Sequence, residues 1–428
     1  MSVPLDRLYH YLDDCVNHDL LIYGWMPHGS TKLEDLKMLH DKITPEEWAV
    51  LKSTLTHEEF ALAVVRHNHA VMICHDQEPL DFDRYSLDEL KTVIKKNTQE
   101  YGKKFSRPEL ANDSAQAEIT LEYCASLGLR GMTNPGNGYD QTILLHSELH
   151  SSHVIKFEQQ GYVPVYYWSH GMIAQDWFRY AKHDPVLKFN PANITSDFLV
   201  YNRAWSGTRE YRLCFTEQIV ENGLSQHCKM SFNPQDNIPY HQYQFVNPEF
   251  QITNYDLHNF FPANTHTANA SADYYGPDYA TSGIEVVLET LFDDTRWHLT
   301  EKSLRPIACG QPFLLMAAPG SLQYLRQYGF ETFEGLLDES YDTVQNPRQR
   351  LQAVIKEMSR ISALPSQKKI QLLQDLDQIA EKNKHHFFKH LFDLVTQEYA
   401  NNMDHAMTVM NQHKTGKHYR YFKNIFTQ

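Results

Sequence analysis

Residues 297–333 constrain the fold most, because they predict a helix, a buried strand and a second helix in close succession. Thr300 can cap the start of the first helix, and Gly310 can end it. Residues 312–318 form a continuous apolar run, which is typical of a strand buried on both faces of a parallel sheet. Gly320 then begins the second helix. A unit of this kind indicates an α/β protein.

The same alternation of strands and helices runs through most of the chain and favours the α/β class. Strands are predicted at residues 20–25, 70–74, 143–146, 163–168, 197–201, 229–232 and 284–291. Helices are predicted at residues 87–101, 172–181, 209–222, 349–361, 366–382 and 386–412. We therefore predict two Rossmann-like domains followed by a C-terminal helical segment.

The boundaries of these parts follow from local composition. Residues 182–191, KHDPVLKFNP, are polar and turn-rich, so we interpret them as the linker between the domains. This places a first domain at 1–185, a second at 190–345 and the helical segment at 346–428. Within the second domain, residues 233–278 form a long polar insertion, which is more often a functional loop or a lid than a passive connection.

Charge and cysteine usage limit the class of protein. The formal net charge is -14, which argues against a generally basic nucleic-acid binder. Residues 413–423 are an exception, since basic and aromatic side chains alternate there, although a solvated tail is the simpler interpretation. The six scattered cysteines are typical of a reducing compartment. Neither a signal peptide nor an apolar run of about 20 residues is recognisable, so we expect a cytoplasmic protein without a membrane partner.

The two helix starts within residues 297–333 are candidates for binding a nucleotide. A helix N-terminus presents backbone N–H groups and the positive end of the helix dipole, both of which suit phosphate. Lys302 and Arg305 add positive charge to the first helix, and Glu301 can accept hydrogen bonds from a ribose diol. Gly320 and Ser321 begin the second helix. The alternative is a capped surface helix with ordinary charged residues.

This pattern resembles the nucleotide-sugar half of GT-B glycosyltransferases, above all the fucosyltransferase-like type found in phages and giant viruses. The resemblance covers about residues 198–342 and includes the Thr300, Glu301 and Lys302 triplet as well as the DESYD run at 338–342. It implies a GT-B fold, in which Thr300 belongs to the donor site, Glu301 contacts the ribose and Lys302 contacts the diphosphate.

A second group of donor candidates lies at residues 201–209, YNRAWSGTR, which follow one predicted strand and begin a helix. This turn resembles the one that opens the donor domain in the viral enzymes. Asn202, Arg203 and Arg209 are therefore predicted to bind the donor, because guanidinium groups bind phosphate in a bidentate manner. Arg212 is a weaker third cation. The alternative is a surface turn with salt bridges.

Carboxylates near the ends of strands in the first half are candidates for the catalytic base. Residues 75–79, HDQEP, follow an apolar strand, and the carboxyl ends of parallel strands border the ligand crevice in open α/β sheets. A sugar transfer with inversion needs a carboxylate that accepts the acceptor proton. Asp76 is the first candidate, Glu78 the second and Glu148 the third, with His75 as an acceptor contact. A capping acid in a tight turn explains Asp76 equally well.

The remaining candidates are histidines. His146, Glu148, His150 and His153 follow a strand and could hold a divalent metal. Because the chain contains 24 histidines, such clusters arise readily by chance, and we predict no metal site. We assign His146 instead to the acceptor side, together with His170, which lies in another strand-to-helix turn.

The sequence thus predicts a glycosyltransferase that moves a sugar from a nucleoside diphosphate sugar to an acceptor hydroxyl with inversion. No cofactor is obligatory, because helix dipoles and cations can stabilise the departing diphosphate. The favoured acceptor is a hydroxylated cytosine in phage DNA that receives glucose or arabinose, in the cytoplasm of the infected host. Other hypotheses are a glycan or small-molecule acceptor, a metal-dependent hydrolase built on the His, Asp and Glu clusters, and a nucleotide-sugar sensor without catalysis. The oligomeric state stays open.

Overall fold

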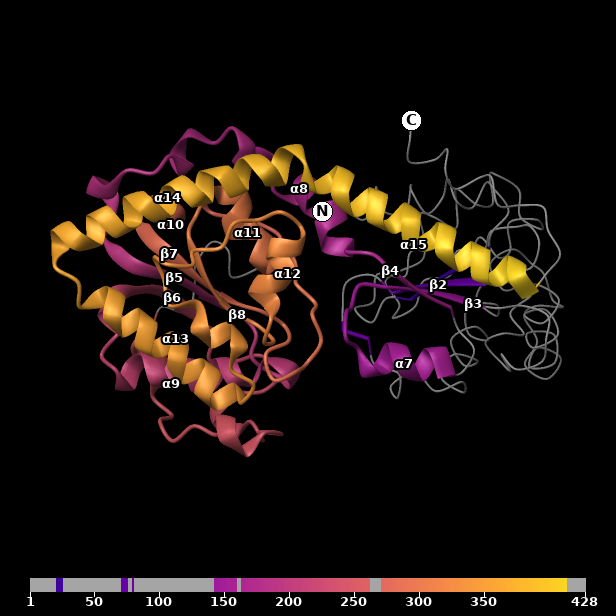
Figure 1. Ribbon diagram of the computed structural model, residues 1–428. Helices are drawn as coiled ribbons and strands as arrows, with labels where there is room; N and C mark the ends of the chain where they lie inside the picture. The colour runs from indigo at the N-terminus through magenta and orange to yellow at the C-terminus, as the bar shows by residue number, and fades with distance from the viewer. Residues whose placement is uncertain are drawn as a thin grey trace, which may run out of the picture. The chain divides into compact units, whose positions relative to one another are not determined.

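The computed structural model describes residues 21–25, 71–75, 79–80, 142–159, 163–261 and 271–413 (Figure 1). The chain divides into two compact units, the first formed by residues 1–169 with 395–428 and the second by residues 170–394. Each unit contains a four-stranded parallel sheet. Within the described residues, no helix is both long enough and apolar enough to cross a bilayer.

The sheet of the first unit has the order β1-β2-β3-β4. Its strands are β1 (Leu21–Trp25), β2 (Val71–His75), β3 (Thr142–His146) and β4 (Val163–Tyr166). Helix α7 (Ser152–Gln159) connects β3 to β4, as a parallel crossover requires. All four strands predicted for the first half are confirmed to within about two residues, which is the usual uncertainty of element ends.

The sheet of the second unit has the order β6-β5-β7-β8. Its strands are β5 (Ser196–Asn202), β6 (Cys228–Phe232), β7 (Ser282–Leu288) and β8 (Phe313–Met316). Every residue of β7 and β8 is buried, which explains their nearly continuous apolar sequences. The chain proceeds from β5 to β6 on one side and then to β7 and β8 on the other. The direction of winding therefore changes between β5 and β7, which makes this the topological switch point of the sheet.

Helices lie on both sides of this second sheet. Figure 1 shows α11 and α14 on one side and α9 and α13 on the other, and each pair is in contact. The helices in chain order are α8 (Ser169–Trp177), α9 (Tyr211–Glu221), α10 (Gly276–Ala280), α11 (Glu301–Cys309), α12 (Ser321–Gln327), α13 (Pro347–Ser362), α14 (Ser366–Lys389) and α15 (Leu391–His413). An α/β fold with parallel sheets and C-terminal helices is confirmed, whereas the pair of Rossmann-like domains stays a prediction.

Short 3-10 helices fill many of the connections. They are η2 (Arg179–Lys182), η3 (Pro185–Leu187), η4 (Pro191–Asn193), η5 (Gly207–Arg209), η6 (Ser225–His227), η7 (Tyr240–Gln242), η8 (Pro248–Phe250), η9 (Leu257–Asn259) and η11 (Glu339–Thr343). The helix predicted at residues 209–222 is confirmed as α9, with η5 in front of it. The helix predicted at 87–101 lies outside the described residues.

The ends of α11 follow the sequence signals. The Thr300 hydroxyl accepts a hydrogen bond from the Lys302 backbone N–H at 3.4 Å and so caps the helix. At the other end Gly310 adopts a left-handed conformation with φ of 71°. This backbone conformation favours glycine, whereas the nearest atom to a Cβ at this position, Glu381 Oε1 on α14, ends a flexible side chain that can move aside.

The division of the chain differs from the one predicted. Residues 182–191 do not join the two units, because the second unit begins at His170. They form η3 and η4 within that unit, where the Asp184 carboxylate accepts hydrogen bonds from the Tyr274 hydroxyl at 3.1 Å and from the Val186 N–H at 2.9 Å. Residues 346–428 also do not form one segment, since α13 and α14 belong to the second unit and the chain from Val395 belongs to the first.

The predicted insertion at residues 233–278 is irregular apart from 3-10 turns and α10, as far as it is described. Two carboxylates from the α9 region fix it in place. Glu210 accepts hydrogen bonds from the backbone N–H groups of Val246 at 2.8 Å and Asn247 at 2.6 Å. Glu217 accepts one from the Thr253 N–H at 2.6 Å. These contacts hold residues 246–253 on α9, where a freely moving lid would lack them.

The packing of α14 on the second unit can be tested by a core substitution. Leu376 is fully buried, so Leu376→Ala should lower the free energy of unfolding by about 2–5 kcal/mol through lost burial and the cavity left behind. Ile370 on the same helix is 41% exposed, so Ile370→Ala should cost much less. Urea denaturation of both variants measures the difference. Equal effects would contradict the orientation of α14.

Candidate functional site

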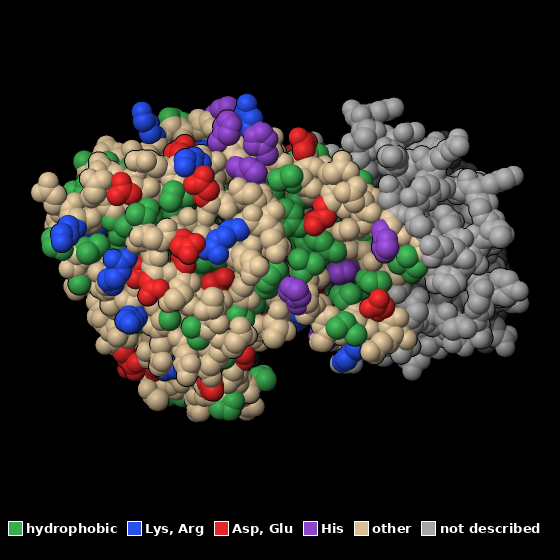
Figure 2. All heavy atoms as spheres, in the orientation of Figure 1, with side chains coloured by type: hydrophobic (Ala, Val, Ile, Leu, Met, Phe, Trp, Pro, Cys, Tyr) green, Lys and Arg blue, Asp and Glu red, His purple; other side chains and the backbone are tan. Residues whose placement is uncertain are grey.

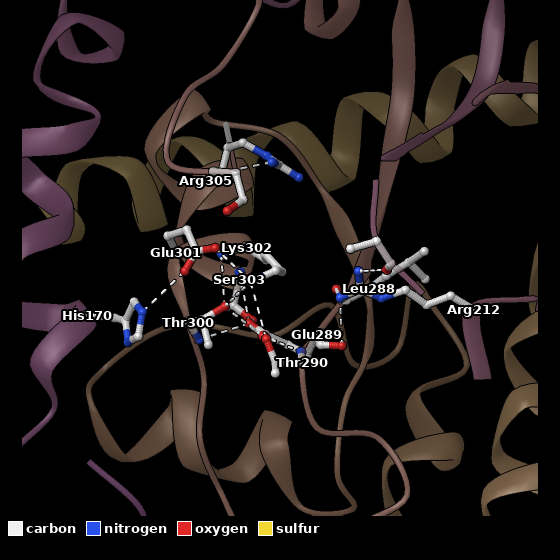
Figure 3. Close-up of polar contacts among 12 residues, drawn as sticks. His170, Arg212, Leu288, Glu289, Thr290, Thr300, Glu301, Lys302, Ser303 and Arg305 are labelled. Atoms are coloured by element: carbon white, nitrogen blue, oxygen red, sulfur yellow. Dashed lines mark hydrogen bonds and ion pairs between the residues drawn. The ribbon is translucent and has the colours of Figure 1, made fainter. Parts of the chain in front are cut away.

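The candidate site lies at the carboxyl-terminal edge of the second sheet, around the ends of β5 and β7 (Figure 3). In open α/β sheets, ligands bind outside the carboxyl ends of the strands at the switch point. Here Asn202 ends β5 and Leu288 ends β7. The predicted donor residues all follow strands β5, β7 and β8, so the topology brings them to the same edge.

Arg212 occupies the switch point itself. Its guanidinium is buried and donates hydrogen bonds to the carbonyl oxygens of Ala204 at 2.5 Å, Leu288 at 2.6 Å and Glu289 at 3.0 Å. Burial lowers the pKa of Arg212, and the positive charge of Arg209 lowers it further. Its Nε atom has no hydrogen-bond partner within the described part of the chain. Arg212 therefore places a positive charge between β5 and β7 while it joins their ends.

Three further candidates lie at the end of β5 or after it. Asn202 is buried, whereas Arg203 and Arg209 are more exposed to solvent. Asn202 is fully buried, and its amide donates hydrogen bonds to the Thr216 hydroxyl at 2.9 Å and to the Arg212 carbonyl oxygen at 3.3 Å. The amide nitrogen thus links β5 to α9, while Oδ1 has no hydrogen-bond partner among the described residues, and the contact of Asn202 with a ligand stays a prediction. Arg203 is exposed and Arg209 is partly exposed, so both guanidinium groups stay candidates for binding an anion.

Glu289 is a central residue that the sequence prediction missed. Its fully buried carboxylate accepts hydrogen bonds from the backbone N–H groups of Thr300 at 2.9 Å and Ser303 at 3.2 Å. It also accepts hydrogen bonds from the side-chain hydroxyls of Thr300 at 2.7 Å and Ser303 at 2.6 Å. Although burial alone would raise the pKa of Glu289, the Lys302 cation and these hydrogen bonds lower it below its ordinary value. Glu289 thus occupies the position at the start of α11 that an anionic ligand would take.

The start of α12 is also occupied by a carboxylate of the protein. Both oxygens of the buried Asp342 carboxylate accept from the Leu322 N–H at 3.2 Å, and the Asp342 carbonyl oxygen accepts from the Gly320 N–H at 2.8 Å. The Ser321 hydroxyl donates to the Ala318 carbonyl oxygen at 2.6 Å. The polar groups of Gly320 and Ser321 thus have partners within the protein, and phosphate binding by these residues stays a prediction.

Arg305 is likewise committed to the core. Its guanidinium forms an ion pair with Glu285 at 2.6 Å and lies over the Tyr201 ring, 4.6 Å from the centroid. Burial alone would lower the pKa of Arg305, but Glu285 raises it well above its ordinary value. The Tyr279 hydroxyl donates to the second oxygen of Glu285 at 2.7 Å. The charge of Arg305 is thus neutralised within the core, and its contact with a donor diphosphate stays a prediction.

Glu301 and Lys302 form a cluster with His170, which we call the His-Glu-Lys cluster (Figure 3). Lys302 Nζ lies 2.7 Å from Glu301 Oε1, and His170 Nε2 lies 3.2 Å from Glu301 Oε2. Lys302 Nζ also donates to the hydroxyls of Thr290 at 3.3 Å and Thr300 at 3.2 Å. Burial alone would raise the pKa of Glu301, but Lys302 and His170 hold it well below its ordinary value. The cluster therefore presents a buried ionised carboxylate beside a partly exposed ammonium group.

His170 reaches this cluster from α8. The sequence prediction placed it on the acceptor side, whereas the structure places it in the same unit as the donor candidates and in contact with Glu301. Its ring packs edge-on against His298, with the centroids 5.7 Å apart, and lies 5.9 Å from the Trp177 ring. The signal for this contact was weak, because His170 and Glu301 are far apart in the sequence.

The described candidates of the first unit, His146 and Glu148, lie at the end of β3 and just after it. Leu80 N–H donates a hydrogen bond to the Glu148 carboxylate, and the Glu148 N–H donates to His146 Nδ1 at 3.4 Å. Burial lowers the pKa of His146 to about 4, so this imidazole is neutral near pH 7. The His75 side chain, Asp76 and Glu78 lie outside the described residues. Over the described ranges, no group of three or more His, Cys, Asp or Glu side chains is arranged to hold a metal ion.

Compared with protein-family models, curated proteins and solved structures, the chain gives no match. The geometry at the edge of the second sheet therefore carries the functional argument.

The structural role of Arg305 predicts a large effect on stability. Arg305→Met leaves the Glu285 carboxylate buried without its cation, which should lower the free energy of unfolding by about 3–5 kcal/mol. The double variant with Glu285→Gln should lose less than the sum of the two single effects, since the pair is coupled. Arg326→Met is the control, because that guanidinium is 41% exposed in its ion pair with Glu339. Additive effects in denaturation experiments would contradict the pairing.

The lowered pKa of Glu301 predicts a stability difference that depends on pH. A carboxyl group with a depressed pKa stabilises the folded state above the ordinary value of 4.5 and loses this contribution as pH falls through the folded-state pKa. Glu301→Gln should therefore destabilise the protein at pH 7 and differ progressively less from the wild type below pH 4.5. Melting temperatures measured from pH 7 downward test this, with Glu334→Gln, 80% exposed, as the control. A difference independent of pH would disagree with an ionised Glu301.

Proposed function

We propose that the protein is a glycosyltransferase that uses a nucleoside diphosphate sugar, and that its second unit binds the donor. The observation that supports this most is the His-Glu-Lys cluster at the carboxyl-terminal edge of an open parallel sheet. Such an edge is the general location for nucleotide ligands in open α/β folds. The cluster combines an acceptor for hydroxyl groups with a cation for phosphate, which are the two chemistries that a nucleoside diphosphate requires.

Glu301 would recognise the ribose. An ionised carboxylate has about four lone-pair sites and accepts hydrogen bonds without donating any. One Glu301 oxygen contacts Lys302 and the other contacts His170, so each oxygen retains capacity for a further donor. A ribose diol supplies two adjacent hydroxyl donors at the spacing of two carboxylate oxygens. Ionised Glu301 therefore suits a ribose better than a phosphate.

Side-chain cations would hold the diphosphate. The backbone N–H groups at the starts of α11 and α12 bind Glu289 and Asp342, so the helix termini contribute less to phosphate binding than the sequence suggested. The cations at this edge are Lys302, Arg203, Arg209 and the buried Arg212. Lys302 Nζ is the best placed, because it already lies beside the ribose acceptor Glu301.

The identity of the acceptor is the second part of the proposal, and the surface charge bears on it. We propose that an acceptor hydroxyl attacks the anomeric carbon of the donor sugar with inversion, while Asp76, Glu78 or Glu148 accepts the hydroxyl proton and the nucleoside diphosphate leaves. A hydroxylated cytosine in phage DNA is the favoured acceptor and a glycan or small molecule the alternative. In Figure 2, basic and acidic side chains are mixed over the displayed face of the described residues, and no broad basic surface is visible there. DNA binding would then depend on flipping of single bases and local contacts more than on overall charge.

Substitution of Lys302 tests the donor site. Donors with UDP, GDP, ADP and CMP should be screened by thermal shift, and one of them should raise the melting temperature, because a ligand that binds only the folded state stabilises it. Lys302→Ala should weaken binding of that donor roughly tenfold or more, since a hydrogen bond to a charged group contributes about 1.5–3 kcal/mol. Lys382→Ala removes an exposed lysine paired with Glu331 and should leave donor affinity unchanged.

Activity then separates the remaining hypotheses. Release of the nucleotide only when hydroxymethylated DNA is added would support the DNA acceptor, and release with a glycan would support the alternative. Donor binding without release under any condition would favour a sensor. No shift with any nucleotide sugar, combined with a shift on addition of zinc or manganese, would overturn the proposal in favour of a metal-dependent hydrolase.

A further inference from the structure

We propose, on the basis of the donor site proposed above, that His170 is a positioning residue that fixes the Glu301 carboxylate and thereby makes the protein selective for ribonucleotides over 2′-deoxyribonucleotides. His170 would act through Glu301 and not through the substrate. This assigns it a role on the donor side of the reaction, whereas its place in a strand-to-helix turn had indicated the acceptor side.

The geometry shows how the carboxylate is held. Lys302 contacts Oε1 of Glu301 at 2.7 Å, and His170 contacts Oε2 at 3.2 Å. The two partners belong to different elements, α11 and α8, so they constrain the two oxygens from different directions (Figure 3). The last torsion of a glutamate side chain is intrinsically broad. With only Lys302 in place, the carboxylate could rotate about this torsion while it kept one ion pair.

His170 is itself held rigidly enough for this role. Its side chain is only 2% exposed, and its ring packs against His298 on one side of the cluster and near Trp177 of its own helix. Burial also strengthens the contact, because a hydrogen bond away from water is weakened little by solvent. The His170 to Glu301 contact therefore restricts the carboxylate to one orientation.

Orientation matters for a diol more than for a phosphate. A carboxylate binds two adjacent hydroxyls only if both of its oxygens point toward them, as in other bidentate pairs. A rotated carboxylate loses one of these hydrogen bonds, and the 2′-hydroxyl then contributes little. Phosphate binding through Lys302 and the arginines depends mainly on charge and would change less. Loss of His170 should therefore reduce discrimination between the two sugars more than it reduces affinity for the diphosphate.

Nucleotide binding to the full-length chain tests this. Calorimetry should give the Kd values of UDP, GDP, ADP and CDP and of their 2′-deoxy counterparts. For the preferred base, the wild type should bind the ribonucleotide roughly tenfold or more tightly, as expected for a hydrogen bond to a charged group. His170→Ala should reduce this ratio to about threefold or less. His170→Gln, whose amide can donate an N–H to Glu301, should retain most of the ratio.

The controls distinguish the possible failures. His183→Ala removes an exposed histidine and should leave the ratio unchanged. If the wild type binds none of the eight nucleotides, the proposed function fails. If it binds one selectively and His170→Ala keeps the full ratio, the positioning role is wrong while the function stands. An equal loss in His170→Ala and His170→Gln would show a packing role and also overturn it. Should His170→Ala not fold, His170→Phe fills the space without a donor and must give the same reduced ratio.

Discussion

The buried guanidinium of Arg212 is the interaction on which the functional edge of the second unit depends. At a switch point the crossovers leave in opposite directions, so the carbonyl ends of β5 and β7 would be buried without partners. Arg212 supplies donors to the last carbonyls of both regions. Its neighbour Tyr211 donates to the Glu289 carbonyl oxygen at 2.7 Å and lies 3.4 Å from that of Met316. Two residues at the start of α9 thus contact carbonyl oxygens at or just after the ends of β5, β7 and β8.

Two carboxylates of the protein already lie at the helix starts near this edge. Glu289 and Asp342 satisfy the starts of α11 and α12, which stabilises both helices. A diphosphate bound as proposed would therefore be held by side-chain cations. Lysine and arginine can reach a ligand while their stems pack on the protein, whereas backbone donors are fixed. In the proposed donor site, recognition would therefore depend on the side chains around the edge, above all Lys302.

The sequence predicted what depends on local pattern. The apolar runs predicted the eight strands found in the described part of the chain, and Thr300 and Gly310 predicted the limits of α11, since these signals involve residues a few positions apart. It did not predict which charges face the core. Arg305 and Glu285 pair across twenty positions, and Glu285 lies within the apolar strand β7. For the same reason Glu289 was taken as the continuation of a strand.

Net charge is the remaining constraint on function, and it acts differently on donor and acceptor. The chain carries a formal charge of -14, and the cations Arg203, Arg209, Arg212 and Lys302 all follow β5 or β7, as do the carboxylates Glu289 and Glu301. At physiological ionic strength charges beyond about 8 Å are largely screened, so a small anion would be affected mainly by the charges nearest to it. A duplex extends far beyond that distance and meets the acidic surface as well. The net charge of the chain is therefore a weaker obstacle to the proposed nucleotide donor than to the proposed DNA acceptor.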